Sequence, residues 1–343
     1  MALPSAALRV ARARALLPRL ESALQDFTTT SAEFRIIHTT PIPPSSSSDD
    51  TTTTQQQQPQ QPHQPPPTLF ILDSSYNPPS LAHFTLATSA LLSFYSSPQT
   101  PPPPPSTHPP ARLLLLFAVR NADKATAATT PAPFPHRLAM LTLFADDVSA
   151  HLSTQLGRRG SRAPPSPPPP SPAPAIDIAL TSHPTYVDKT AAIAASPAYP
   201  PGTAHVHLLG HDTLTRLFSP RYYAGSALPL AALRPYFAAG HRLRVTLRPT
   251  SASAEAAPVE GEGEDEGAAQ RAFVERLARG DLEPEGASRA WAAAIEVVEG
   301  EREALGVSST AVREACRKGD WEAVGRMCSE GVSAWVREVG EYR

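Results

Sequence analysis

A group of polar side chains follows the short apolar run "TLFILD" (68–73), which has the length of a buried strand. The side chains able to donate or accept hydrogen bonds in the turn that follows are Asp73, Ser74, Ser75 and Asn77. After two prolines, Ser80 and His83 stand at positions i and i+3 of a helix-like stretch. Unpaired N–H groups and the positive end of the helix dipole coincide at a helix N-terminus, so this segment predicts a site for phosphate oxygens. The alternative is that Ser80 only caps the helix and His83 is an ordinary surface residue.

A second candidate site lies near the end of the chain, in "VSSTAVREACRKGD" (307–320). Ser308, Ser309 and Thr310 offer hydroxyl groups at the start of a predicted helix over 308–319. Arg313 follows about one turn later on the same face, where its permanent charge and paired N–H donors suit a phosphate or a leaving pyrophosphate. The expected buried stripe of this helix is Val312, Ala315 and Cys316. The alternative is a capped amphipathic helix whose arginine is solvated.

A third candidate is the pair Gly210 and Asp212, directly after the strand-like run 205–209. An acid at the end of a strand is placed to bind ribose hydroxyls, although aspartate is also a common helix N-cap. His205 and His207 alternate on one face of the same strand, and we interpret them as structural. No third ligand stands at a spacing typical of a metal site, so we predict none.

The elements that must position these residues alternate between strand and helix. Apolar runs predict strands at 68–73, 112–119, 175–180, 205–209, 242–248 and 293–299. Helical periodicity or helix-start signals predict helices at about 80–95, 135–151, 186–195, 212–218, 228–239 and 308–319. This alternation is typical of an α/β protein with a mainly parallel sheet and helices on both faces. Ligands of such sheets collect at the carboxyl ends of the strands, which is where the three candidate sites fall.

The segment "SSYNPPSLAH" (74–83) resembles the GSFxPxHxGH motif of the nicotinamide mononucleotide adenylyltransferases, a family of the nucleotidylyltransferase superfamily. His83 matches the second histidine of the motif, Tyr76 its aromatic position and Asn77 its polar position. The departures from the motif are Ser80 in place of the first histidine, and Ser74 and Ala82 in place of two glycines. "SSTAVR" (308–313) is similar to the family's ISSTxxR motif, and "GHD" (210–212) to its GxD motif.

This resemblance implies a Rossmann-like sheet of the nucleotidylyltransferase fold, with His83, Arg313 and Ser80 at the catalytic centre. The nucleotide-binding residues implied by position are Ser74, Ser75, Tyr76, Asn77, Lys124, Gly210, Asp212, Ser308, Ser309 and Thr310. Lys124 fits only by its place after the second strand, where a solvated loop lysine is an equal interpretation. The segment 183–190 lies where relatives contact the nicotinamide nucleotide, and no roles are assigned in it.

The implied reaction is adenylyl transfer from ATP to nicotinamide mononucleotide, giving NAD and pyrophosphate, as in pyridine nucleotide biosynthesis. Such a transfer depends on positioning and charge stabilisation, and it needs no side-chain nucleophile. Mg²⁺ is expected to be held mainly through phosphate oxygens and water, without an all-protein site. One alternative is the same fold acting on another phosphorylated acceptor. A second is an ATP-binding protein or weak ATPase with an adaptor role, which would bind ATP without releasing pyrophosphate when acceptor is added.

Composition indicates one domain over residues 1–343, which the resemblance implies is a nucleotidylyltransferase domain. It is interrupted by low-complexity insertions at about 41–67, 98–110, 157–175 and 251–268. These segments are rich in Pro, Ser, Thr and Gln, or are small and acidic, and they bury too little apolar surface to form a core. The remaining residues, about 260, suffice for one α/β domain. The proline tracts have the composition that SH3 or WW domains bind, but such tracts more often serve as spacers.

Charge and apolar content exclude two classes of partner. The net charge of −2 argues against a general nucleic-acid-binding surface, and no apolar run is long enough to span a bilayer.

Two cysteines, Cys316 and Cys328, form no disulfide framework, which suits a reducing compartment. The first twenty residues hold four arginines and no acid, as mitochondrial presequences do, but leucines at helical spacing predict an ordinary helix. We therefore expect the cytoplasm or nucleus in preference to the mitochondrion.

Overall fold

The structure, a computed structural model, describes residues 3–40, 68–97, 111–120, 131–160, 174–223, 227–247 and 264–343. Lys124 and two of the expected insertions, 41–67 and 98–110, lie outside these residues. Within them, no helix has the length and apolar character needed to cross a membrane.

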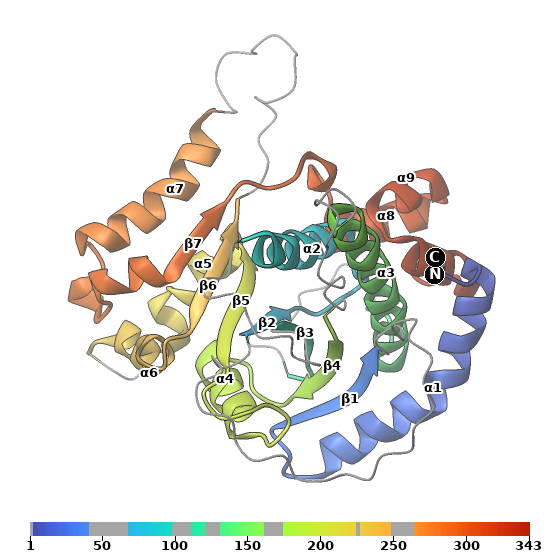
Figure 1. Cartoon of the computed structure of the whole chain (residues 1–343), viewed down its shortest axis with the longest axis horizontal. Helices are drawn as coiled ribbons and strands as arrows, with labels where there is room; N and C mark the ends of the chain where they lie inside the picture. The colour runs from blue at the N-terminus through green and yellow to red at the C-terminus, as the bar shows by residue number, and fades with distance from the viewer. Residues whose placement is uncertain are drawn as a thin grey trace.

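In the part of the chain that the structure describes, seven strands form one sheet in the order β1-β4-β3-β2-β5-β6-β7 (Figure 1). Their bounds are β1 Phe34–Thr40, β2 Thr68–Asp73, β3 Ala111–Ala118, β4 Ile176–Thr181, β5 Ala204–Gly210, β6 Arg242–Thr246 and β7 Ile295–Val298. Only β1 runs antiparallel to its neighbour, β4, and the other five pairings are parallel. The chain builds outward from β2 to β3 and β4, then crosses to the other side of β2 at β5. The carboxyl ends of β2 and β5 therefore flank the switch point, where such sheets bind ligands.

Ten α-helices and several short 3₁₀ helices lie in the described parts of the chain. Their bounds are α1 Ala6–Thr29, α2 Leu81–Ser96, α3 Phe134–Gly160, α4 Tyr186–Ala195, α5 His211–Leu217, α6 Arg234–Ala238, α7 Glu264–Arg279, α8 Ser309–Lys318, α9 Trp321–Met327 and α10 Glu330–Val339. Two 3₁₀ helices matter below, η1 (Pro220–Tyr223) and η2 (Pro229–Leu233).

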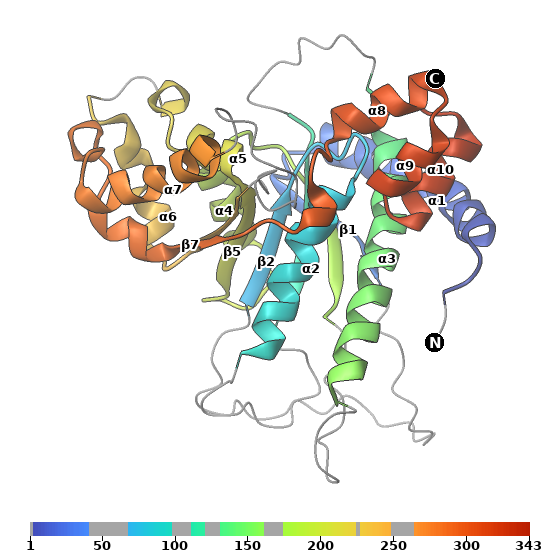
Figure 2. The same ribbon diagram turned by 90° about the horizontal axis from the view of Figure 1, so that it is seen from above.

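Helices cover both faces of the sheet. Alternate residues of the central strands point to opposite faces, so each of these strands packs on both sides. Phe70 and Leu72 of β2 pack on one face with α1, α2, α3 and α8–α10. Leu69 and Ile71 pack on the other face, with Ile193 of α4. Figure 2 shows α2 and α3 side by side along the first face, with α8–α10 gathered at one end of α3. A separate apolar cluster joins β5–β7 to the helices between α5 and α7. The α/β, Rossmann-like architecture expected from the sequence is confirmed.

The edge strand β1 was not predicted, and a buried carboxylate holds it in place. Asp177 of β4 is fully buried and accepts a hydrogen bond from Thr39 Oγ1 of β1 at 2.7 Å. Its oxygens also accept from Arg112 Nε and Nη2, at 3.0 and 2.8 Å, and from the Tyr199 hydroxyl at 3.0 Å. A charge removed from water is tolerated when it is paired and hydrogen-bonded in this way.

Several expected boundaries need correction. The insertion placed at 157–175 begins inside α3, which runs to Gly160, and the one placed at 251–268 ends inside α7, which begins at Glu264. Helices α7, α9 and α10 were not predicted. The single helix expected over about 228–239 is η2 followed by α6, because Pro235 lacks an N–H and opens a new helix in its first turn.

The low-complexity segments are expected to be dispensable for folding. We predict that replacing 41–67 and 251–263 by short flexible linkers leaves the melting temperature within a few degrees of the parent, because loop-closure entropy changes by only about 0.6 kcal/mol per doubling of length. The measurement is thermal unfolding followed by circular dichroism. Deleting 251–268 serves as the comparison, since it also removes the start of α7 and should lower the melting temperature further. An insoluble first variant would contradict the single-domain organisation.

Candidate functional site

The loop after β2 connects Asp73 to the start of α2 and is anchored by Tyr76. This tyrosine has a left-handed backbone (φ 45°), its side chain is fully buried, and its hydroxyl donates to Leu72 O. Its ring lies 5.3 Å from the ring of His83. The buried side chain of Tyr76 therefore fixes the loop beneath His83. Only the backbone of Tyr76 is placed to contact a bound nucleotide.

His83 is held by hydrogen bonds at both ring nitrogens. The backbone N–H of Ser80 donates to His83 Nδ1 at 3.1 Å, so Nδ1 is an acceptor and the proton resides on Nε2. Nε2 lies 2.9 Å from Ser74 Oγ, to which it donates. Burial lowers the pKa of His83 to about 4, so the imidazole is neutral near pH 7. The ligand-free loop thus contains a neutral N–H donor paired with the hydroxyl of Ser74.

The N-terminus of α8 packs directly on this loop. Ser309 Oγ donates to Pro78 O at 2.7 Å, and Arg313 Nη1 donates to Asn77 O at 2.7 Å. Arg313 Nη2 also donates to Thr310 Oγ1 at 3.1 Å. The predicted helix is confirmed, with Ser308 as N-cap accepting from the N–H of Ala311. Two candidate segments that are far apart in the sequence therefore form one surface.

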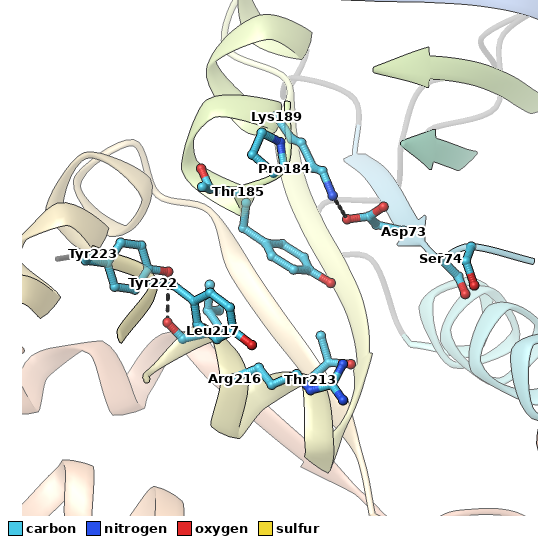
Figure 3. Close-up of a pocket in the computed structure, with 12 residues that line it drawn as sticks. Asp73, Ser74, Pro184, Thr185, Lys189, Thr213, Arg216, Leu217, Tyr222 and Tyr223 are labelled. Atoms are coloured by element: carbon cyan, nitrogen blue, oxygen red, sulfur yellow. Dashed lines mark hydrogen bonds and ion pairs between the residues drawn. The ribbon is translucent and has the colours of Figure 1, made fainter. Parts of the chain in front are cut away.

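A pocket of about 340 Å³ opens beside the loop, at the carboxyl ends of β2 and β5 (Figure 3). It is lined by Asp73, Ser74, Ser75, Pro184, Thr185, Tyr186, Lys189, Thr213, Arg216, Leu217, Tyr222 and Tyr223. Figure 3 shows Asp73, Ser74 and Lys189 on the side nearer the loop, with Tyr222 and Tyr223 on the opposite side. One side is thus polar and next to the loop, while the other carries aromatic rings.

A buried ion pair closes the polar side of the pocket. Lys189 of α4 pairs with Asp73 of β2, and both side chains are 7% exposed. The Lys189 ammonium also lies 5.4 Å from the ring centre of Tyr186. Because each charge compensates the other, the pair adds no net charge to the pocket, and removing one partner would leave the other buried and unpaired.

The remaining predicted residues fall in different places. Gly210 is the N-cap of α5 and Asp212 lies in the first turn of that helix, whose residue Thr213 lines the pocket. Asp212 is therefore not the N-cap considered from the sequence. The side-chain oxygen of Asn77 accepts from Ala132 N–H at 3.1 Å and from the Tyr342 hydroxyl at 2.9 Å, so it holds the loop to other segments. Lys124 lies outside the described residues.

The structural interpretation of His205 and His207 agrees with their burial. His207 Nδ1 lies 2.9 Å from the Tyr236 hydroxyl, which itself donates to Arg242 O at 2.8 Å. His205 stacks on His241 with ring centres 4.3 Å apart. Burial lowers the pKa of His205 to about 3 and that of His207 well below its usual value. Both rings are therefore buried, neutral groups of β5.

Several pocket residues were not assigned from the sequence. Lys189 and Tyr186 stand in the segment 183–190, whose position was noted without roles. Tyr222 and Tyr223 of η1 carry no periodic signal that separates them from core aromatics. Only the tertiary fold brings them to one pocket. Among the residues that the structure describes, no group of three or more His, Cys, Asp or Glu side chains is arranged to hold a metal ion.

Comparison with known proteins gives a likeness of fold. No family model and no curated protein matches the chain. Among solved structures, it is similar to a Plasmodium falciparum nicotinic acid mononucleotide adenylyltransferase complexed with APC, with a TM-score of 0.38 and 11% sequence identity. The similarity covers 80% of this chain and 97% of that one. At this identity, function has to be argued from the residues of this chain.

The buried histidines predict a dependence of stability on pH. Because the pKa values of His83 and His205 are lowered to about 4 and about 3 in the folded state, the unfolded chain binds more protons below pH 6.5. We expect the free energy of unfolding to decrease as the pH falls from about 6.5 towards 4. Nitrogen-15 NMR of the imidazoles, assigned with a His83→Gln variant, should show His83 neutral and protonated on Nε2 at about pH 5.5. A charged His83 at that pH would contradict the assignment.

Proposed function

We propose that this chain transfers the adenylyl group of ATP to nicotinamide mononucleotide, producing NAD and pyrophosphate. The observation that carries the proposal is the contact between the loop after β2 and α8. Both segments resemble phosphate-binding motifs of one family, and Ser309 and Arg313 join them by hydrogen bonds of 2.7 Å. The two segments meet beside a pocket at the switch point of the sheet, where such sheets bind ligands, and this supports a site that holds both nucleotides.

The triphosphate would lie on the loop and the N-terminus of α8. Arg313 brings a permanent positive charge to this surface, and His83 brings a neutral Nε2–H donor. A phosphate oxygen that replaces Ser74 Oγ as the partner of His83 would strengthen that hydrogen bond, because an ionised acceptor is the better one. Negative charge beside the imidazole would also raise the pKa of His83 from its lowered value.

The acceptor would occupy the 340 Å³ pocket. The aromatic side formed with Tyr222 and Tyr223 suits a planar base, and the acceptor phosphate would then lie on the polar side, near the loop. In the reaction an oxygen of that phosphate forms a bond to the α-phosphorus of ATP, and the bond from the α-phosphorus to pyrophosphate breaks. No covalent intermediate with the protein is needed, so catalysis consists of alignment and charge stabilisation.

Magnesium fits this site as an ion carried by the nucleotide. The carboxylate that lines the pocket, Asp73, is engaged by Lys189, and no acidic cluster stands beside it in the described chain. Mg²⁺ bound to phosphate oxygens and water would supply charge neutralisation at the reacting phosphates.

One observation favours a second candidate, an ATP-binding protein without transferase activity. Ser74 replaces a motif glycine, and its hydroxyl accepts the Nε2–H of His83. A phosphate must displace this hydroxyl before it can use the donor. The departure thus offers a physical reason for weak turnover with retained nucleotide binding.

The deciding experiment incubates the protein with ATP, Mg²⁺ and single phosphorylated acceptors while pyrophosphate is measured. The proposal expects release with nicotinamide mononucleotide and formation of NAD. Release with a different acceptor alone would move the assignment to another nucleotidylyltransferase. Binding of ATP without release for every acceptor would favour the second candidate.

We predict that His83→Ala reduces kcat by an amount equivalent to roughly 2–4 kcal/mol, the typical effect of losing a donor that stabilises transition-state charge. The melting temperature should remain close to that of the parent. His38→Ala on the edge strand β1, far from the loop in the sheet order, is the matched control and should retain activity. Turnover of the His83 variant within threefold of the parent would remove His83 from the catalytic centre.

A separate prediction concerns Arg313. Arg313→Lys keeps the charge but loses the paired donors, so we expect a higher KM for ATP, a lower kcat and a nearly unchanged KM for the acceptor. Arg313→Ala should be more damaging in the same direction. Arg317→Lys, at an exposed position one turn later in α8, controls for changes to the helix. Loss of acceptor affinity with ATP affinity retained would show that the arginine does not bind the triphosphate.

A further inference from the structure

Four side chains from other segments donate hydrogen bonds to carbonyl oxygens of the loop after β2. The pairs are Arg137 Nη1 to Ser75 O at 3.2 Å, Arg313 Nη1 to Asn77 O at 2.7 Å, Ser309 Oγ to Pro78 O at 2.7 Å, and Cys328 Sγ to Pro79 O at 3.6 Å. Three of these donors come from the C-terminal helices or their junctions. The fourth, Arg137, comes from α3 and belongs to none of the motifs.

Arg137 connects to His83 through the peptide between Ser75 and Tyr76. The carbonyl of that peptide accepts from Arg137, and its N–H, on the opposite edge, points to Ser74 Oγ at a long distance of 3.5 Å. Ser74 Oγ in turn lies 2.9 Å from His83 Nε2. A rotation of this one peptide would therefore remove its N–H from the hydroxyl that faces the imidazole. The position of Arg137 is thus linked to the geometry of the predicted phosphate donor.

The Arg137 side chain is itself rigidly placed. Its Nε donates to Ala132 O at 2.9 Å, and its guanidinium carbon lies 4.5 Å from the ring centre of Phe134 and 5.4 Å from that of Phe117. The residue is 6% exposed. Two aromatic rings and two carbonyl oxygens fix the plane of the guanidinium. A lysine ammonium is not planar and could not be fixed in this way.

Among the residues that the structure describes, no carboxylate forms an ion pair with Arg137, whose hydrogen-bond partners are carbonyl oxygens. Burial lowers the pKa of Arg137, and the charge of the nearby Arg313 lowers it further, against a raising effect of Tyr342. Elsewhere in the fold the buried cations are paired, as Arg9 is with Asp147 and Lys189 with Asp73. A buried charge without a counter-ion is costly. An anion bound on the loop would supply the missing compensation.

We propose that Arg137 is a positioning residue of the phosphate site, which fixes the Ser75–Tyr76 peptide under His83 and provides positive charge that a bound triphosphate neutralises. The inference rests on the proposed function for its effect on turnover. Its effect on triphosphate binding does not require that the protein be a transferase.

The test compares Arg137→Met and Arg137→Lys with the parent, and uses Arg317→Met as a control that removes an exposed charge from α8. Calorimetry measures the affinities for inorganic triphosphate and for adenosine, and turnover is measured with the acceptor that the screen identifies. For Arg137→Met we expect triphosphate affinity to fall by about tenfold or more, with adenosine affinity changed less than about twofold. For Arg137→Lys we expect triphosphate affinity within about threefold of the parent and kcat reduced by about tenfold, because charge is kept and the two-carbonyl contact is lost.

Each outcome decides the proposal. Equal losses for triphosphate and adenosine, or no loss for either, would show a purely structural role and overturn it. If Arg137→Met does not fold, the lysine variant decides through kcat and the melting temperature, and parental turnover would overturn the proposal. A parent protein that binds triphosphate but transfers no adenylyl group contradicts the proposed function alone, and the affinities of the variants then decide the role of Arg137. A parent that binds no triphosphate overturns both.

Discussion

The site depends on hydrogen bonds from α8 to the backbone carbonyls of the loop after β2. Pro78 and Pro79 have no backbone N–H, so the loop has fewer donors for hydrogen bonds within itself. Its carbonyl oxygens therefore need donors from other segments. Ser309 and Arg313 supply them from positions 231 and 236 residues later in the chain. These contacts tie the shape of the loop to the packing of the C-terminal helices, and with it the geometry of the phosphate site that we propose.

Charge is distributed around this loop in a pattern that suits an anion. Asp73 and Lys189 neutralise each other at the edge of the pocket, and His83 is neutral because burial lowers its pKa to about 4. Arg137 and Arg313 both donate to carbonyl oxygens of the same loop. Their mutual repulsion is a cost that a polyphosphate on the loop would relieve. The same surface thus gains stability when it binds the substrate that the proposal assigns to it.

Sequence patterns predicted the sheet better than the site. The central strands are continuous apolar runs because both of their faces are buried, and six of the seven were expected at nearly their observed positions. The edge strand β1 was missed because its half-exposed pattern is weak, and its attachment to Asp177 is a tertiary contact. His83 and Arg313 were found by motif, whereas the Lys189–Asp73 pair and the role of Arg137 depend on which side chains meet across helices. An arginine on an amphipathic helix such as α3 carries no local sign that its partner is a loop carbonyl.

The most direct measurement is a crystal structure of the protein with a non-hydrolysable ATP analogue and nicotinamide mononucleotide. The account predicts the triphosphate on the loop after β2, with oxygens within hydrogen-bond distance of His83 Nε2 and Arg313, and with Ser74 Oγ displaced from the imidazole. The acceptor base should lie against the tyrosines of the pocket. A triphosphate bound away from this loop, with Arg313 still bonded to Asn77 and Thr310 and to no phosphate oxygen, would contradict the account.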